Sequence, residues 1–105
     1  MAAITSRATD GFGVNAVFDS IGKDYFNNCL DLLAPSGMYV LYGGASGPVP
    51  PFDLMRLNAK SLAIRRPTLA TYTSTASQRL ARLSELISLT ESGKLRYPAT
   101  KVFPL

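Results

Sequence analysis

Histidine is absent from the 105 residues of this sequence, and cysteine occurs only once, as Cys29. Without histidine, catalytic groups of the Ser-His-Asp or Cys-His type are excluded. A zinc site usually needs about three or four cysteine, histidine or carboxylate ligands, and this composition does not supply a typical set. A single cysteine also excludes a disulfide within the chain, which fits a cytoplasmic setting. We therefore expect no metal site and no histidine-based catalysis.

Long apolar runs are missing as well. No stretch approaches the roughly 18 residues that a membrane-spanning helix requires, and the N-terminus lacks the apolar core of a signal peptide. The net charge of +4 comes from 11 basic and 7 acidic residues, but only Arg65 and Arg66 are adjacent basic residues. We interpret this as a solvated surface and expect no membrane or nucleic-acid partner. A small basic nucleic-acid binder is kept as an alternative.

The order of apolar runs and turn residues predicts alternating strands and helices. Residues 14–20 and 38–42 predict strands buried on both faces, and 61–66 predict a more polar edge strand ended by Pro67. Between the first two strands, Asp24 is expected to cap a helix that Pro35 and Gly37 end. The apolar face of that helix comprises Phe26, Cys29, Leu30 and Leu33.

The second half of the chain predicts a helical turn near 52–58, a helix over 76–92 and a last strand over 100–105. Thr75 and Gln78 have the spacing of a capping box, and Gly93 ends the longer helix. Such alternation indicates an α/β fold with a parallel sheet. Few strands and only two clear helices are available to cover the sheet, so we expect part of a larger domain.

Residues 11–16, G-F-G-V-N-A, match the G-x-G-x-x-A pattern of dinucleotide-binding loops. That loop must follow a strand and open a helix, so that the helix N-terminus faces the pyrophosphate. Here the glycines follow a predicted helix end and open a strand. We therefore interpret Gly11 and Gly13 as a helix-to-strand turn.

Four segments carry a family resemblance in combination: V-F-D-S-I-G at 17–22, G-x-x-V-x-Y-G-x-x-S-G at 37–47, R-P-T-L at 66–69 and S-G-K-L at 92–95. From Thr9 to Leu105 the chain resembles the zinc-independent NADPH:quinone oxidoreductases (the zeta-crystallin type) of the medium-chain dehydrogenase/reductase superfamily. The resemblance implies the C-terminal half of a Rossmann-type doubly wound parallel sheet, namely strands four, five and six of the order 3-2-1-4-5-6.

The resemblance also implies that residues 1–105 form a partial nucleotide-binding domain. The phosphate-binding half would precede Met1, and residues from about 98 to 105 would return toward a missing substrate domain. The implied activity is reduction of quinones or enones by NADPH. The isolated chain is then expected to bind NADPH weakly or not at all and to lack catalytic competence.

Ligands of parallel sheets bind beyond the carboxyl ends of the strands, so the residues that follow each strand are candidates. Glycine in these loops lets the main chain approach a flat ring. Together with the resemblance, this predicts a nicotinamide-side wall made of Ser20, Tyr42, Gly43, Gly44, Ala45, Arg66, Pro67 and Thr68, with Ser46 in the same loop. Asp19 is expected to cap a neighbouring loop and Cys29 to pack in the core. No residue is assigned as acid, base or metal ligand.

The edge strand supports a second hypothesis. In the family that this chain resembles, the strand at 61–67 often pairs with its copy in a second subunit, which implies a homodimer. The chain is then alternatively a non-catalytic, dimerising interaction module.

Overall fold

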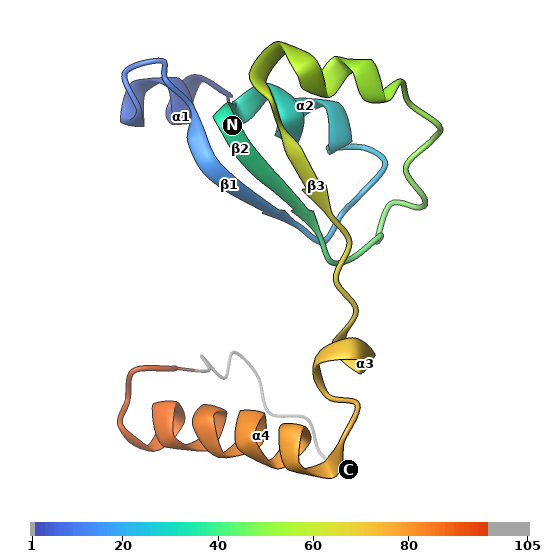
Figure 1. The fold of residues 1–105 in the computed structure, drawn as a ribbon. Helices are drawn as coiled ribbons and strands as arrows, with labels where there is room; N and C mark the ends of the chain where they lie inside the picture. The colour runs from blue at the N-terminus through green and yellow to red at the C-terminus, as the bar shows by residue number, and fades with distance from the viewer. Residues whose placement is uncertain (1, 97–105) are drawn as a thin grey trace, which may run out of the picture. The chain divides into compact units, whose positions relative to one another are not determined.

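The computed structural model describes residues 2–96, which belong to two units, Met1–Thr68 and Leu69–Leu105. The first unit contains α1 (Ala2–Ala8), β1 (Val14–Asp19), α2 (Phe26–Leu32), β2 (Leu33–Leu41), the 3₁₀ helix η1 (Leu54–Lys60) and β3 (Ala63–Arg65). The second contains α3 (Leu69–Tyr72) and α4 (Ala76–Glu91) (Figure 1). The strand predicted at 100–105 lies outside the described residues.

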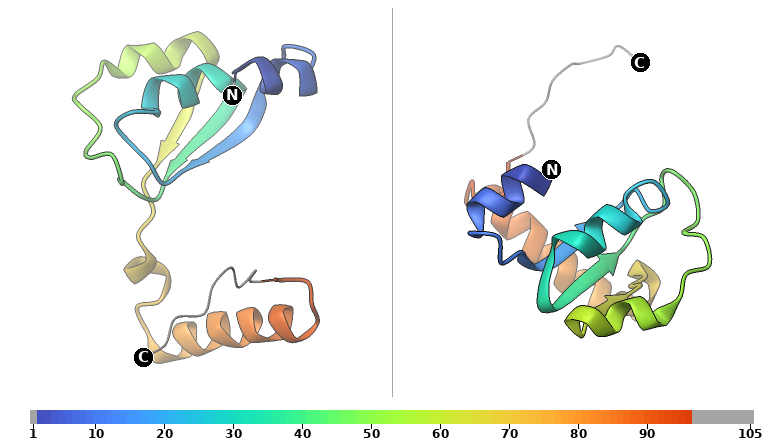
Figure 2. Two further views of the ribbon diagram at one scale, coloured as in Figure 1. Left: turned by 180° about the vertical axis from the view of Figure 1, so that it is seen from behind. Right: turned by 90° about the horizontal axis from the view of Figure 1, so that it is seen from above.

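The three strands form one parallel sheet in the order β1-β2-β3, which confirms the predicted α/β class (Figure 2). Val17, Tyr39 and Ile64 occupy one row across the sheet. Because β1 and β3 both run parallel to β2, the carboxyl ends of all three strands lie at the same edge. β3 is an edge strand, as predicted.

The core lies on the face of the sheet that α2 covers. Phe26, Cys29 and Leu30 of α2 are buried with Leu33 and Tyr39 of β2. The Phe26 ring meets the Tyr39 ring edge-on, with centroids 5.4 Å apart, a favourable geometry for aromatic pairs. Val49, Phe52, Leu57 and Leu62 pack against this cluster from the segment that contains η1.

The prediction that 14–20 and 38–42 would be buried on both faces is wrong for part of the face opposite Tyr39. There Phe18 is 71% exposed and Met38 is 38% exposed, although Val40 on the same face is buried. Successive side chains of a strand point to opposite faces, and α2 covers only one of them.

The junction between α2 and β2 also differs from the prediction. The helix follows Tyr25 without a side-chain cap, so Asp24 does not cap it. It ends at Leu32, and β2 begins at Leu33 rather than at residue 38. Pro35 and Gly37 lie within β2, where the register shifts and Ser36 adopts a φ of 60°. Proline offers no N–H to the neighbouring strand, which suits an irregular stretch.

The glycine-rich turn before β1 is confirmed as a helix-to-strand connection, because α1 precedes it and β1 follows it. Gly11 and Gly13 have φ angles of 79° and 93°. A Cβ on Gly13 would lie 2.7 Å from the Leu32 carbonyl oxygen. Gly13 thus serves close chain packing and a left-handed turn.

The predicted helix at 76–92 is confirmed as α4, Ala76–Glu91, with the predicted capping box. The Gln78 N–H donates to Thr75 Oγ1 at 3.2 Å, and the Thr75 N–H donates to Gln78 Oε1 at 3.2 Å. Gly93 follows with a φ of 70°. None of the helices between residues 2 and 96 has the length and apolarity needed to cross a membrane.

Candidate functional site

The loops that follow β1 and β2 are joined along their lengths by hydrogen bonds. Main-chain N–H groups of Tyr42 and Gly43 donate to the Asp19 carbonyl oxygen at 2.9 and 3.3 Å. Further along, the Ala45 N–H donates to the Ser20 carbonyl oxygen at 3.1 Å, and the Ser46 N–H to that of Ile21 at 2.8 Å. The two loops therefore behave as one structural unit, which we call the paired loops (residues 20–24 and 42–47).

Side chains and glycines reinforce this pairing. Ser46 Oγ donates to the Ile21 carbonyl oxygen at 2.9 Å and accepts from the Asp24 N–H at 3.1 Å. A Cβ on Gly43 would lie only 2.4 Å from the Ser20 carbonyl oxygen. Such a contact is impossible for a real side chain, so residue 43 must be glycine for the loops to lie this close.

Asp19 ends β1 and is buried, with 5% of its surface exposed. Its carboxylate accepts from the Ile21 N–H at 2.7 Å, the Gly22 N–H at 3.1 Å and the Tyr39 hydroxyl at 2.6 Å. The prediction that Asp19 caps a neighbouring loop is thus confirmed. Burial, together with the hydrogen bond to Asp19, raises the pKa of the Tyr39 hydroxyl, which therefore stays a donor.

A cavity of about 360 Å³ opens beside the paired loops at the carboxyl ends of the strands. It is lined by Leu41, Gly43, Gly44, Gly47, Pro48, Val49 and Arg66. Arg66 follows β3, and its guanidinium donates to the Leu41 carbonyl oxygen at 2.9 Å. The cavity is therefore lined by three glycines, three apolar residues and one cationic residue.

Some of the predicted site residues line this cavity, and others lie next to those that do. Gly43, Gly44 and Arg66 line it. The main chain of Ser20 touches Gly43, and that of Ala45 bonds to Ser20. Tyr42 is 54% exposed at the start of its loop, and Pro67 and Thr68 follow Arg66 along the chain. The sequence-based prediction missed four lining residues, Leu41, Gly47, Pro48 and Val49, although the Gly-Pro pair is a turn signal.

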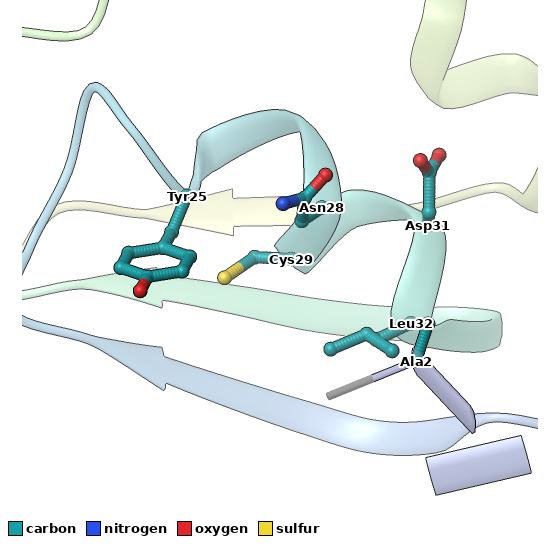
Figure 3. Close-up of a pocket in the computed structure, with 6 residues that line it drawn as sticks. All are labelled: Ala2, Tyr25, Asn28, Cys29, Asp31 and Leu32. Carbon is teal, nitrogen blue, oxygen red and sulfur yellow. The ribbon is translucent and has the colours of Figure 1, made fainter. Parts of the chain in front are cut away.

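A second cavity, of about 330 Å³, lies beside α2 near the start of α1 (Figure 3). It is lined by Ala2, Tyr25, Asn28, Cys29, Asp31 and Leu32. Cys29 is buried, and burial, followed by the charge of Asp19, raises the pKa of its thiol. The prediction that Cys29 packs in the core is confirmed, and its protonated thiol is a poor nucleophile.

Metal ligands do not cluster in the part of the chain that the structure describes. Within residues 2–96 no three histidine, cysteine or acidic side chains are placed to hold a metal ion.

Comparison with known proteins gives a consistent result. The family model described as zinc-binding dehydrogenase matches residues 2–105. The chain is 42% identical over 98 residues to a quinone oxidoreductase of Pseudomonas aeruginosa, covering 92% of this chain and 30% of that protein. It is 39% identical over 106 residues to a 2-haloacrylate reductase of a Burkholderia species, covering 99% of this chain and 32% of that protein.

A solved structure extends the comparison to three dimensions. The Escherichia coli quinone oxidoreductase complexed with NADPH superimposes with a TM-score of 0.85 at 34% identity, covering 97% of this chain and 31% of that one. The chain thus spans about a third of the length of the proteins it matches.

Proposed function

This chain belongs to the zinc-binding dehydrogenase family, and we propose that it forms the nicotinamide-side wall of an NADPH site. Within the family it groups with the quinone oxidoreductases of the medium-chain dehydrogenase/reductase superfamily. The proposed wall consists of Ser20, Tyr42, Gly43, Gly44, Ala45, Arg66, Pro67 and Thr68. The whole protein would reduce quinones or enones. In this proposal residues 1–105 belong to a nucleotide-binding domain, and residues from about 98 to 105 lead toward a substrate domain.

One observation carries the proposal: a cavity lined by three glycines and Arg66 lies at the carboxyl ends of parallel strands. This is where α/β sheets bind nucleotides. The cavity volume falls in the range of roughly 300–1,000 Å³ that small-molecule sites occupy. A Cβ on Gly44 would lie 3.8 Å from the Gly47 carbonyl oxygen, so this part of the wall leaves its main chain open to a flat ring.

Bound NADPH supplies the hydride, and the residues of this chain orient the ring and exclude water. No described residue is placed as a proton donor or acceptor for substrate. We propose a zinc-independent reaction, as implied by the resemblance of the segments at 17–22 and 37–47 to the zeta-crystallin-type quinone oxidoreductases. A cytoplasmic setting, without membrane or nucleic-acid partners, agrees with the single cysteine and the scattered charges.

The proposal predicts a specific binding pattern for the 105-residue chain. Isothermal titration should detect no micromolar affinity for NADPH, because phosphate-binding segments would lie elsewhere. In NMR spectra, a large excess of NADPH should shift the amide signals of Ser20, Gly43 and Gly44, while Leu86 in α4 serves as a control.

Two half-cofactors sharpen this experiment. Reduced nicotinamide mononucleotide should reproduce the shifts of NADPH, whereas adenosine 2′,5′-bisphosphate should not, because the wall is proposed for the nicotinamide half. Equal responses to both compounds, or no response of the paired loops to either, would contradict the proposal.

A second candidate function is a dimerising module without catalysis. The position of β3 at the edge of the sheet supports it, because an edge strand can pair with another chain. We propose a homodimer through residues 61–67 for either function. Light scattering would test it: a strict monomer at high concentration argues against the dimer, and a dimer whose paired loops ignore nicotinamide mononucleotide favours the module.

A further inference from the structure

The buried carboxylate of Asp19 connects the interior of the sheet to the paired loops. Burying a charge is costly unless hydrogen bonds compensate it. Here one carboxylate receives three donors, two from the loop that follows β1 and one from Tyr39 near the end of β2. An apolar residue would fill the same space without this cost, so packing alone does not account for an aspartate.

Packing alone does not account for the hydroxyl of Tyr39 either. Its ring lies against Phe26 in the core, a contact that phenylalanine would make equally well. Tyr39 is completely buried, and its hydroxyl donates to Asp19 Oδ2 at 2.6 Å. The Tyr39 hydroxyl therefore contributes a hydrogen bond to the Asp19 carboxylate, and this bond is what phenylalanine would not supply.

The carboxylate in turn orients the first of the paired loops. Its two loop bonds fix the N–H groups of Ile21 and Gly22. The peptide plane that carries the Ile21 N–H also carries the Ser20 carbonyl, and the plane of the Gly22 N–H carries the Ile21 carbonyl. These two carbonyl oxygens are the acceptors for Ala45 and Ser46 across the loop pair. The Asp19 carboxylate thus sets the direction of two of the main-chain bonds that hold the glycine loop.

We infer that Asp19 and Tyr39 form a positioning pair that holds the glycine wall of the nicotinamide site in place without touching the ligand. This inference rests on the proposed function and adds to it the residues that order the site. Ligand binding to a loop ordered only part of the time weakens in proportion to the ordered fraction. The pair therefore controls affinity at a distance from the cavity.

Two substitutions test the pair, and a third serves as a control for general destabilisation. Tyr39→Phe keeps the ring and removes one donor. Asp19→Asn keeps the shape but loses acceptor capacity, so at least one former donor is left unpaired. Leu57→Ala removes apolar contact from the core cluster without touching the carboxylate.

The first measurement is hydrogen exchange in the 105-residue chain without ligand. In Tyr39→Phe the Ala45 and Ser46 amides should exchange about tenfold faster or more, because a bond to a charged acceptor is lost. Asp19→Asn should have a larger effect. The exchange rates of the α4 amides should be unchanged. Leu57→Ala should not speed exchange in the paired loops more than in the rest of the first unit.

The second measurement is NMR titration with reduced nicotinamide mononucleotide. Affinity should fall about threefold or more in Tyr39→Phe, since only the ordered loop binds, and should stay at the wild-type value in Leu57→Ala. Unchanged exchange at Ala45 and Ser46 overturns the positioning pair. Faster exchange with unchanged affinity also overturns it, while the proposed function stands. A wild-type chain whose paired loops do not respond to the ligand overturns the proposed function, and with it this inference.

Discussion

Replacing Gly43 by alanine tests the close contact on which the paired loops depend. The added Cβ would lie 2.4 Å from the Ser20 carbonyl oxygen, 2.7 Å from its Cα and 2.9 Å from its carbonyl carbon. All three are main-chain atoms, so no side chain can rotate away. The loops would have to separate by about 1 Å to restore ordinary contact.

That separation would break the bonds from Tyr42 and Gly43 to the Asp19 carbonyl oxygen, which are already 2.9 and 3.3 Å long. Overpacking costs about 1–3 kcal/mol, and each lost hydrogen bond about 1 kcal/mol. We expect Gly43→Ala to lower the free energy of unfolding by about 3–5 kcal/mol. For a domain of this size the melting temperature would fall by about 20 °C.

Gly44→Ala is the matched control one residue away. Its Cβ would meet only the Gly47 carbonyl oxygen, at 3.8 Å, and the φ angle of Gly44 is not positive. We expect a change within about 0.5 kcal/mol. Urea denaturation followed by the NMR signals of Val17 and Val40 reports on the sheet alone. Equal midpoints for the two alanine variants would refute the close contact.

Three further predictions follow from single interactions. Because the pKa of Tyr39 is raised, the folded state resists ionisation of its hydroxyl. The stability that the neutral hydroxyl contributes is therefore present below about pH 10 and is lost as the pH rises above it. Tyr39→Phe should flatten that alkaline loss in urea titrations; an equally steep loss would argue against the assignment. Cys29 should react slowly with a thiol reagent in native buffer and rapidly in urea, because its thiol is buried and its pKa is raised; equal rates would contradict this. Thr75→Ala should cost α4 about 1 kcal/mol through the loss of the bond from Gln78, seen as reduced helical circular dichroism, and unchanged helicity would show that the cap contributes nothing.

The elements that the sequence predicted well are those whose signals are local. The capping box of Thr75 and Gln78 and the end at Gly93 both lie next to the helix they define. The edge of the sheet that holds the candidate residues could also be predicted, because the parallel direction of the strands brings the loops after β1, β2 and β3 together. Gly43, Gly44 and Arg66 line one cavity for this reason, and their role in binding NADPH stays a prediction.

The features that the prediction missed depend on distant parts of the chain. Pro35 and Gly37 are typical helix terminators, yet here they lie in an irregular part of β2 opposite β1. The exposure of Phe18 depends on which faces the helices cover. Gly47 lines the cavity, and its carbonyl oxygen accepts from the Lys23 N–H, 24 residues earlier in the chain. No short motif predicts a contact between residues so far apart in the sequence.

The paired loops have a consequence for how such a site diverges. Their shape is held by main-chain bonds, one buried carboxylate and a glycine that admits no side chain. Exposed positions such as Tyr42 and Ala45 can therefore accept new side chains while the wall keeps its form. Substitutions at these positions would then change the surface that the wall presents without rebuilding the scaffold that holds it.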